Sequence, residues 1–182
     1  MLVLASKSPR RAEILQGAGV PFIVRAADIH EQREPGESPE NYARRLAFDK
    51  AAAVQLARDE VALGADTIVV VDDRVLEKPA DAAEARRMLA LLSGREHEVI
   101  TGICLRSEHR SVVDAAVTRV QFAPLSPREI EEYVASGEPM DKAGAYAIQG
   151  LASKFIERIE GDYFNVVGLP IALVSRRLRE FG

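Results

Sequence analysis

One acidic residue stands inside an apolar run, and it is the clearest chemical feature of the sequence. Asp66 lies in VALGADTIVVV, which has the continuous apolar character of a buried strand. A carboxylate is costly to bury unless it is paired, bound to a metal, or placed at a strand end facing a cleft. Gly64 leaves room for another backbone or a ligand, and Thr67 points to the opposite face. Asp66 is therefore a candidate general base or metal ligand; a structural acid held by backbone N–H groups is an equally good interpretation of this segment alone.

The segment SKSPRR at residues 6–11 has the features of an anion site at a helix start. A strand ends there, Ser8 is placed to cap a helix, and Pro9 would occupy the first turn. Backbone N–H groups at a helix start favour anions, and Arg10 and Arg11 are suited to grip phosphate oxygens through forked hydrogen bonds. Taken alone, the segment favours a plainer interpretation, a capped helix with solvated arginines, because it lacks the glycines of known phosphate loops.

Three of the five lysines stand in constrained settings, although the chain otherwise prefers arginine. Lys50 falls on the inward face of a predicted helix, Lys78 precedes Pro79, and Lys142 follows Asp141. A compact ammonium suits a polyphosphate. Chance placement and snorkelling of the side chains to the surface explain the same pattern, so both interpretations stay open.

Two further polar residues are candidates for a nucleotide site. Gln149 lies between Gly144 and Gly150, and its amide offers the donor and acceptor that read a base edge. A polar loop that packs on itself is the alternative. Glu31, in the charged stretch HEQREP, is a candidate second acid for a metal, and alone it would be taken as surface charge.

The elements that must position these residues alternate between strand and helix. Strands are predicted over 1–5, 20–26, 61–71 and 155–159, a hairpin over 96–107 with 111–122, and helices over 9–17, 39–58, 81–92 and 126–135. A last helix is predicted to present the apolar residues at 167, 171, 174, 178 and 181 on one packing face. The pattern indicates an α/β or mixed α+β fold.

Composition narrows the class of protein. The 182 residues suit one domain or two small lobes that share a core, and 47% hydrophobic with 29% charged residues is ordinary for a globular enzyme. A net charge of −4 argues against broad binding to nucleic acid or to an anionic membrane. Cys104 is the sole cysteine and the apolar N-terminal stretch is short, so we expect a cytoplasmic protein with no internal disulfide, signal peptide or membrane anchor.

Several separated segments together resemble one family, Maf. They are SKSPRR, Glu31 with Arg33, RLAFDKA, GADTIVVVDDRVLEKP, LSGREHEVITG, and SGEPMDKAGAYAIQG with NVVGLP, and they span nearly the whole chain. The block ending in AYAIQG is similar to that of the dTTP and UTP pyrophosphatase branch. The resemblance implies one domain over residues 1–182, with a twisted mixed sheet flanked by helices and two lobes around a central cleft, similar to inosine triphosphate pyrophosphatases, and a homodimer.

The resemblance also implies roles for individual residues. Asp66 would be the proton acceptor, and Asp66 and Glu31 would hold Mg²⁺ or Mn²⁺. Base specificity would depend on Arg10, Thr67 and Gln149. The phosphate region would be lined by Ser8, Arg11, Lys50, Lys78 and Lys142.

The function expected from this resemblance is hydrolysis of a pyrimidine nucleoside triphosphate to the monophosphate and pyrophosphate, in the cytoplasm. Three alternatives remain: a pyrophosphatase acting on non-standard purine nucleotides, a nucleotide sensor that regulates cell division, and a nucleic-acid-binding module. The last is disfavoured by the acidic balance and by the absence of tryptophan and of aromatic stacking motifs.

Overall fold

The computed structural model describes residues 1–26 and 28–181 and contains a mixed sheet with flanking helices. The strand order is β2-β1-β3-β5-β6-β7, and β4 pairs with β3. The strands are β1 (Leu2–Leu4), β2 (Phe22–Val24), β3 (Val61–Val71), β4 (Arg74–Leu76), β5 (Glu96–Arg106), β6 (Ser111–Phe122) and β7 (Ile156–Glu160). Parallel pairing of β1 with β2 and β3, and antiparallel pairing of β3 with β4 and of β6 with β7, make the sheet mixed. The predicted α/β class with a mixed sheet is confirmed.

The chain divides into two compact units. Unit 1 comprises residues 1–67, 101–116 and 168–182, and unit 2 comprises residues 68–100 and 117–167. Strands β3, β5 and β6 each contribute residues to both units. The central cleft implied by the resemblance stays a prediction.

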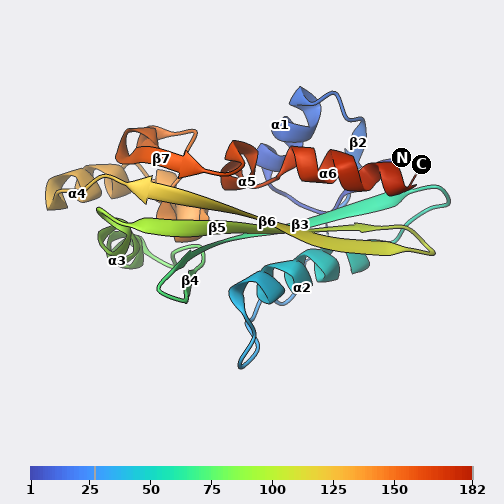
Figure 1. Cartoon of the computed structure of the whole chain (residues 1–182), viewed down its shortest axis with the longest axis horizontal. Coiled ribbons are helices and arrows are strands. Elements are labelled where there is room, and N and C mark those ends of the chain that lie inside the picture. Colours follow the sequence, from blue (N-terminus) through green and yellow to red (C-terminus); the bar gives the residue numbers. More distant parts are fainter. Residues whose placement is uncertain (27, 182) are drawn as a thin grey trace. The chain divides into compact units, whose positions relative to one another are not determined.

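In unit 1, helix α2 (Pro39–Ala52) lies on one side of the sheet, and α1 (Pro9–Gly17) and α6 (Ile171–Leu178) lie on the other (Figure 1). The backbone of α2 approaches the sheet closely because glycines face it. A Cβ at Gly64 would overlap the carbonyl oxygen of Ala47, and one at Gly102 would overlap that of Ala43. The expected close approach of a backbone at Gly64 is confirmed, and it fixes the depth at which α2 packs.

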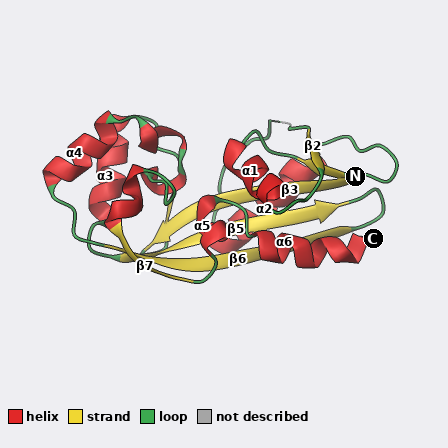
Figure 2. Ribbon diagram, turned by 90° about the horizontal axis from the view of Figure 1, so that it is seen from above, coloured by secondary structure: helices red, strands yellow, loops and turns green. Residues whose placement is uncertain are grey.

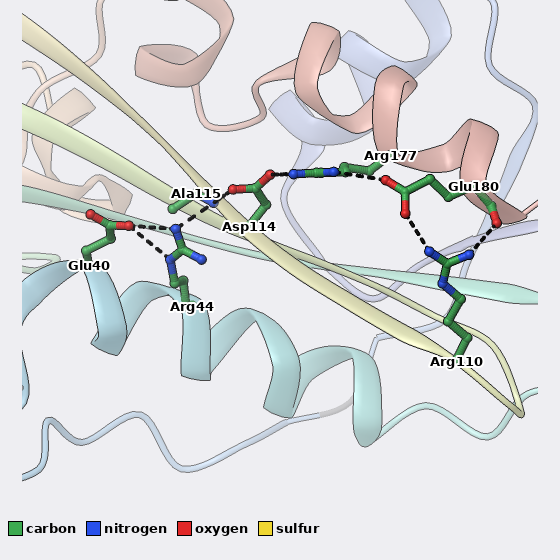
Figure 3. Close-up of polar contacts among 7 residues, drawn as sticks. All are labelled: Glu40, Arg44, Arg110, Asp114, Ala115, Arg177 and Glu180. Atoms are coloured by element: carbon green, nitrogen blue, oxygen red, sulfur yellow. Dashed lines mark hydrogen bonds and ion pairs between the residues drawn. The ribbon is translucent and has the colours of Figure 1, made fainter.

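A chain of ion pairs links α2, β6 and the C-terminal helix region within unit 1 (Figure 3). Asp114 on β6 contacts Arg177 of α6 at 2.7 Å and Arg44 of α2 at 3.8 Å. The remaining pairs are Arg44–Glu40 at 2.7 Å, Arg177–Glu180 at 2.9 Å and Arg110–Glu180 at 2.6 Å. Because the members share partners, this network fixes α2 and α6 on β6 more effectively than isolated surface pairs would.

Unit 2 has its own aromatic core. Helices α3 (Ala82–Leu92) and α4 (Pro127–Ala135) lie side by side (Figure 2), and α4 begins with a capping box between Ser126 and Glu129. The stretch that follows α4 forms three short 3₁₀ segments, η1 (Glu138–Asp141), η2 (Ala143–Ala145) and η3 (Leu151–Phe155), and then β7 and α5 (Tyr163–Val167). Buried aromatic rings make edge contacts in this core: Phe122 with Tyr146 at 4.8 Å between centroids, and Tyr133 with Phe155 at 5.5 Å.

The helix predicted over 39–58 is too long, because α2 ends at Ala52. The backbone after it is bonded elsewhere: the Gln55 carbonyl accepts from Arg25, and the Ala57 N–H donates to the Glu60 carboxylate. These bonds to side chains, one to a distant residue and one to a residue three positions away, replace the helical ones, and no glycine or proline marks the change in the sequence.

The last predicted packing face is divided between two helices. Val167 belongs to α5, whereas Val174 lies in α6, which starts only after Pro170. Gly168 between them has φ +128°, which interrupts the helix. Strand β4 and the 3₁₀ segments were not predicted. None of the described helices is long and apolar enough to cross a membrane.

Candidate active site

Asp66 lies on β3 with its side chain buried and paired. Lys50 of α2 donates a hydrogen bond of 2.6 Å to Asp66 Oδ1, so the predicted inward direction of Lys50 is confirmed. The same ammonium lies 2.7 Å from Glu31 Oε1. The close packing of α2 at Gly64 allows this reach, because Gly64 and Asp66 are two residues apart on β3 and Lys50 stands between Ala47 and Ala51 on α2. One ammonium thus contacts both predicted acids.

Burial and charge act on Asp66 in opposite directions. Burial raises the pKa of Asp66, while the neighbouring Lys50 and Arg11 favour its ionised form and Glu31 disfavours it. The balance keeps the pKa of Asp66 above its ordinary value. A buried carboxylate with a raised pKa, next to cations, is the environment expected for a general base.

Arg11 is buried and bonded to three parts of unit 1. Its Nε donates to the carbonyl oxygen of Gly168 at 2.8 Å, Nη1 to Ser6 Oγ at 3.1 Å, and Nη2 to Thr67 Oγ1 at 3.1 Å. Burial lowers the pKa of Arg11, against the opposing charge of Asp66. Thr67 Oγ1 also lies 2.9 Å from Thr101 Oγ1. This fork ties the start of α1 to β3 beside Asp66.

Ser8 occupies the N-cap position of α1, with Pro9 next to it, but its side chain makes no capping hydrogen bond. The prediction that the Ser8 hydroxyl caps the helix is therefore wrong. Instead, the Ser8 backbone N–H donates to Ser6 Oγ at 3.2 Å, and that hydroxyl also accepts from Arg11. Arg10 lies half-buried in the first turn of α1.

Unit 2 carries the three other predicted site residues. Gly144 N–H donates to the Glu77 carbonyl at 3.1 Å, so the segment bearing the exposed Lys78 lies beside the 3₁₀ stretch. Lys142 Nζ donates to the Glu138 carbonyl at 2.9 Å and to Asp141 Oδ1 at 2.6 Å. Gln149 is exposed, in the turn after η2.

The structure thus brings Glu31, Lys50 and Arg11 together around Asp66 and the adjacent Thr67. Unit 1 contains Ser8, Arg10, Arg11, Glu31, Lys50, Asp66 and Thr67, and unit 2 contains Lys78, Lys142 and Gln149. Sequence reasoning missed Ser6, Thr101 and the Gly168 carbonyl as partners of this group. Ser6 belongs to the motif SKSPRR and Gly168 to NVVGLP. Both motifs were recognised in the sequence, but neither residue was given a role.

The two acids near Lys50 fit a hard divalent cation. Among residues 1–26 and 28–181, no group of three or more His, Cys, Asp or Glu side chains is arranged to hold a metal. Mg²⁺ is usually bound through one or two carboxylates together with substrate phosphates and water, so Glu31 and Asp66 are a sufficient protein donor set. Such an ion would be bound with the phosphates of a ligand.

Comparison with known proteins gives a consistent picture. Residues 1–181 match the family Maf, described as Maf-like protein. The chain is 54% identical to a dTTP/UTP pyrophosphatase of Koribacter versatilis and 51% identical to one of Symbiobacterium thermophilum, each over 182 residues that cover 100% of this chain and 94% of the relative. A solved structure of a HAM1 protein from Coxiella burnetii has a similar fold, with a TM-score of 0.54, 19% identity and 98% of each chain covered.

Proposed function

Because this chain belongs to the Maf family, we propose that it hydrolyses dTTP and UTP to the nucleoside monophosphate and pyrophosphate. The observation that carries the proposal is the contact of one half-buried ammonium, that of Lys50, with both Asp66 and Glu31. A protein that only binds nucleotides has no need of a buried carboxylate with a raised pKa beside cations, whereas a hydrolase needs a base.

In the proposed reaction, Asp66 accepts a proton from the water that attacks the α-phosphorus. The bond between the α-phosphorus and the oxygen that bridges to the β-phosphorus breaks, and pyrophosphate leaves with that oxygen. Glu31 and Asp66 would hold Mg²⁺ or Mn²⁺, which when bound supplies neutralisation of the phosphate charge. Phosphoryl-type chemistry depends mainly on positioning and charge, so Arg11 and Lys50 contribute by orienting and neutralising the triphosphate.

The other residues have binding roles in this proposal. Ser8, Lys78 and Lys142 contribute to the phosphate region. Arg10, Thr67 and Gln149 determine which base is accepted, and Gln149 reads the O4 and N3–H edge that uracil and thymine share. Arg11, which is proposed to bind phosphate, donates a hydrogen bond to Thr67 of β3, which is proposed to help select the base. The two roles therefore depend on one contact.

A pyrophosphate-release assay across UTP, dTTP, CTP, GTP and ITP, with Mg²⁺ or Mn²⁺ and an EDTA control, tests the proposal. We expect UTP and dTTP to be the best substrates and EDTA to abolish turnover. A preference for ITP would support the alternative of a purine pyrophosphatase. Tight nucleotide binding without any pyrophosphate would support the sensor instead.

A cytoplasmic location and a homodimer complete the proposal. The homodimer follows from the resemblance, and the cytoplasmic location from the single cysteine and the short apolar stretch at the N-terminus. Sedimentation of the purified protein tests the proposed homodimer, and a monomer at micromolar concentration would contradict it.

A further inference from the structure

The turn that carries Gln149 is held at both ends by side chains from elsewhere in unit 2. At its start, the Ala147 N–H donates to the Tyr133 hydroxyl at 3.2 Å. At its end, the Leu151 N–H donates to Glu138 Oε2 at 3.0 Å. The Tyr133 hydroxyl in turn donates to Glu138 Oε1 at 2.8 Å, which joins the two holding groups.

The chain itself makes room for this arrangement at Gly150. A Cβ added there would overlap both carboxylate oxygens of Glu138. The backbone of Gly150 has φ −105°, which alanine also adopts, so the space for the carboxylate is the reason for glycine at this position. The turn closes with a hydrogen bond of 3.1 Å from the Gly150 N–H to the Ala147 carbonyl.

Glu138 is itself fixed in place. Its carbonyl oxygen accepts from Lys142 Nζ, and its backbone N–H donates to Ser136 Oγ at 3.2 Å. Tyr133 is 3% exposed on the buried face of α4, and its ring packs edge-on against Phe155. The two groups therefore belong to the rigid part of unit 2, whereas the Gln149 side chain is exposed. An exposed amide can discriminate between ligands only if its backbone is held.

We propose that Glu138 and Tyr133 are positioning residues for base recognition, because they hold the Ala147–Leu151 turn in the conformation that presents Gln149 to a pyrimidine. This inference rests on the proposed function, since it takes Gln149 as the residue that reads the base. Neither residue needs to touch the nucleotide. Their effect on it passes through the backbone of the turn.

Steady-state kinetics of Glu138→Ala and Tyr133→Phe with UTP, dTTP, CTP and GTP test the proposal. We expect Glu138→Ala to raise KM for UTP about tenfold and to narrow the preference for UTP over CTP and GTP by a similar factor, as for a lost buried hydrogen bond. The kcat should stay within about threefold of wild type, because Asp66 and Lys50 are untouched. Tyr133→Phe, which removes one oxygen atom only, should give the same pattern to a smaller degree.

A double-mutant comparison separates positioning from loss of fold. Gly150→Ala should displace the carboxylate and reproduce the kinetics of Glu138→Ala in the wild-type background. In the Glu138→Ala background the same substitution should add little, because the group it would displace is gone. Glu132→Gln, which changes an exposed carboxylate on the same helix α4, is the matched control and should leave all parameters at wild-type values.

The outcomes distinguish this inference from the function on which it rests. If the wild-type protein does not release pyrophosphate from UTP, the proposed function fails first. If wild type is active and Glu138→Ala and Tyr133→Phe keep the KM for UTP and the base preference, the positioning role is wrong. Lowered thermal stability or kcat with an unchanged base preference would likewise overturn it. If Glu138→Ala does not fold, the KM for UTP and the base preference of Tyr133→Phe and Gly150→Ala decide whether the positioning role holds.

Discussion

Lys50 contacts both carboxylates that a bound metal would use. Its ammonium lies within 2.7 Å of Glu31 and 2.6 Å of Asp66, at distances of charge-assisted hydrogen bonds. A divalent cation held by these acids would compete with the ammonium for the two carboxylates. In the proposed enzyme, the phosphates of the nucleotide would give the displaced ammonium a new partner, so metal and nucleotide should bind together.

Replacing Lys50 tests this competition. We expect Lys50→Met to bind Mn²⁺ about tenfold more tightly than wild type in the absence of nucleotide, because two carboxylates lose their internal counter-ion. Titration of Mn²⁺ followed by electron paramagnetic resonance measures the affinity. Lys154→Met, at a lysine that lies over the Phe155 ring in unit 2, is the control. Equal or weaker Mn²⁺ binding by Lys50→Met would show that the carboxylates do not form the metal site.

Gln149 gives a second prediction at the level of single residues. Gln149→Ala should raise KM for UTP and dTTP and reduce discrimination against other bases by about 1 to 3 kcal/mol, the effect of one buried hydrogen bond lost. The ranking of nucleoside triphosphates by kcat/KM measures it. An unchanged ranking would mean that another residue reads the base.

The residue pattern predicted that Asp66 and Lys50 both point inward, but it did not predict which groups they bond to. An acid in an apolar strand and a lysine on an apolar helix face both needed partners, and they became partners of each other. The three bonds of Arg11 depend on Ser6, Thr67 and a carbonyl at position 168. Two of these partners, at positions 67 and 168, are distant from Arg11 in the chain, and such contacts are set by tertiary packing, which no local pattern encodes.

At the level of elements, the depth at which α2 sits on β3 decides where Lys50 reaches. Glycines at positions 64 and 102 allow the helix backbone, with its alanines, to come into direct contact with the sheet. The ion pair between Arg44 and Asp114 also holds the same helix on the sheet, at β6. The position of Lys50 relative to Asp66 is thus a consequence of small residues at a helix–sheet contact.

Gly64→Ala tests this dependence. The added methyl group would overlap the Ala47 carbonyl, so α2 must move outward, and we expect a loss of about 1 to 3 kcal/mol in the free energy of unfolding. Turnover should fall more than stability alone explains, because Lys50 moves away from Asp66. Gly17→Ala, where an added Cβ meets nothing within 4 Å, is the matched control and should be neutral in both chemical denaturation and kinetics. A fully active and stable Gly64→Ala protein would contradict the packing argument.

The elements themselves were well predicted where local signals were strong. Helix α1 and strand β3 have the predicted bounds, and Pro9 marks the first turn of α1. The failures have physical causes. The backbone after α2 is bonded to the side chains of Arg25 and Glu60. Strand β4 is only three residues long and is joined to β3 by a turn in which Asp72 and Asp73 both have positive φ. Aspartate tolerates positive φ, but in a sequence it is a weaker signal of a turn than glycine.

For the molecule as a whole, the buried His97 should make stability depend on pH. His97 Nε2 lies 2.8 Å from the Tyr146 hydroxyl, and burial lowers the pKa of His97 to about 4. The ordinary histidine pKa is 6.5, so between pH 6.5 and 4 the unfolded chain binds a proton that the folded one does not. The stability contributed by neutral His97 is therefore complete above pH 6.5 and is lost as the pH falls toward 4.

Urea denaturation at pH 7 and pH 5 measures this effect. We expect His97 to account for about 2 kcal/mol of the stability lost over that interval. His97→Phe should be less stable at pH 7, because Tyr146 loses its partner, and should lose less on acidification than wild type. His109→Gln, at an exposed histidine, should keep the wild-type dependence. Identical pH dependence in wild type and His97→Phe would show that folding does not lower the pKa of His97.

Turnover of Asp66→Asn is the most direct test of the central claim, that the carboxylate beside Lys50 is the base for pyrophosphate release. The amide keeps the shape of the side chain but does not accept the proton, so kcat for UTP should fall by about a hundredfold or more while circular dichroism shows an intact fold. Turnover of the folded variant close to that of wild type would contradict the account.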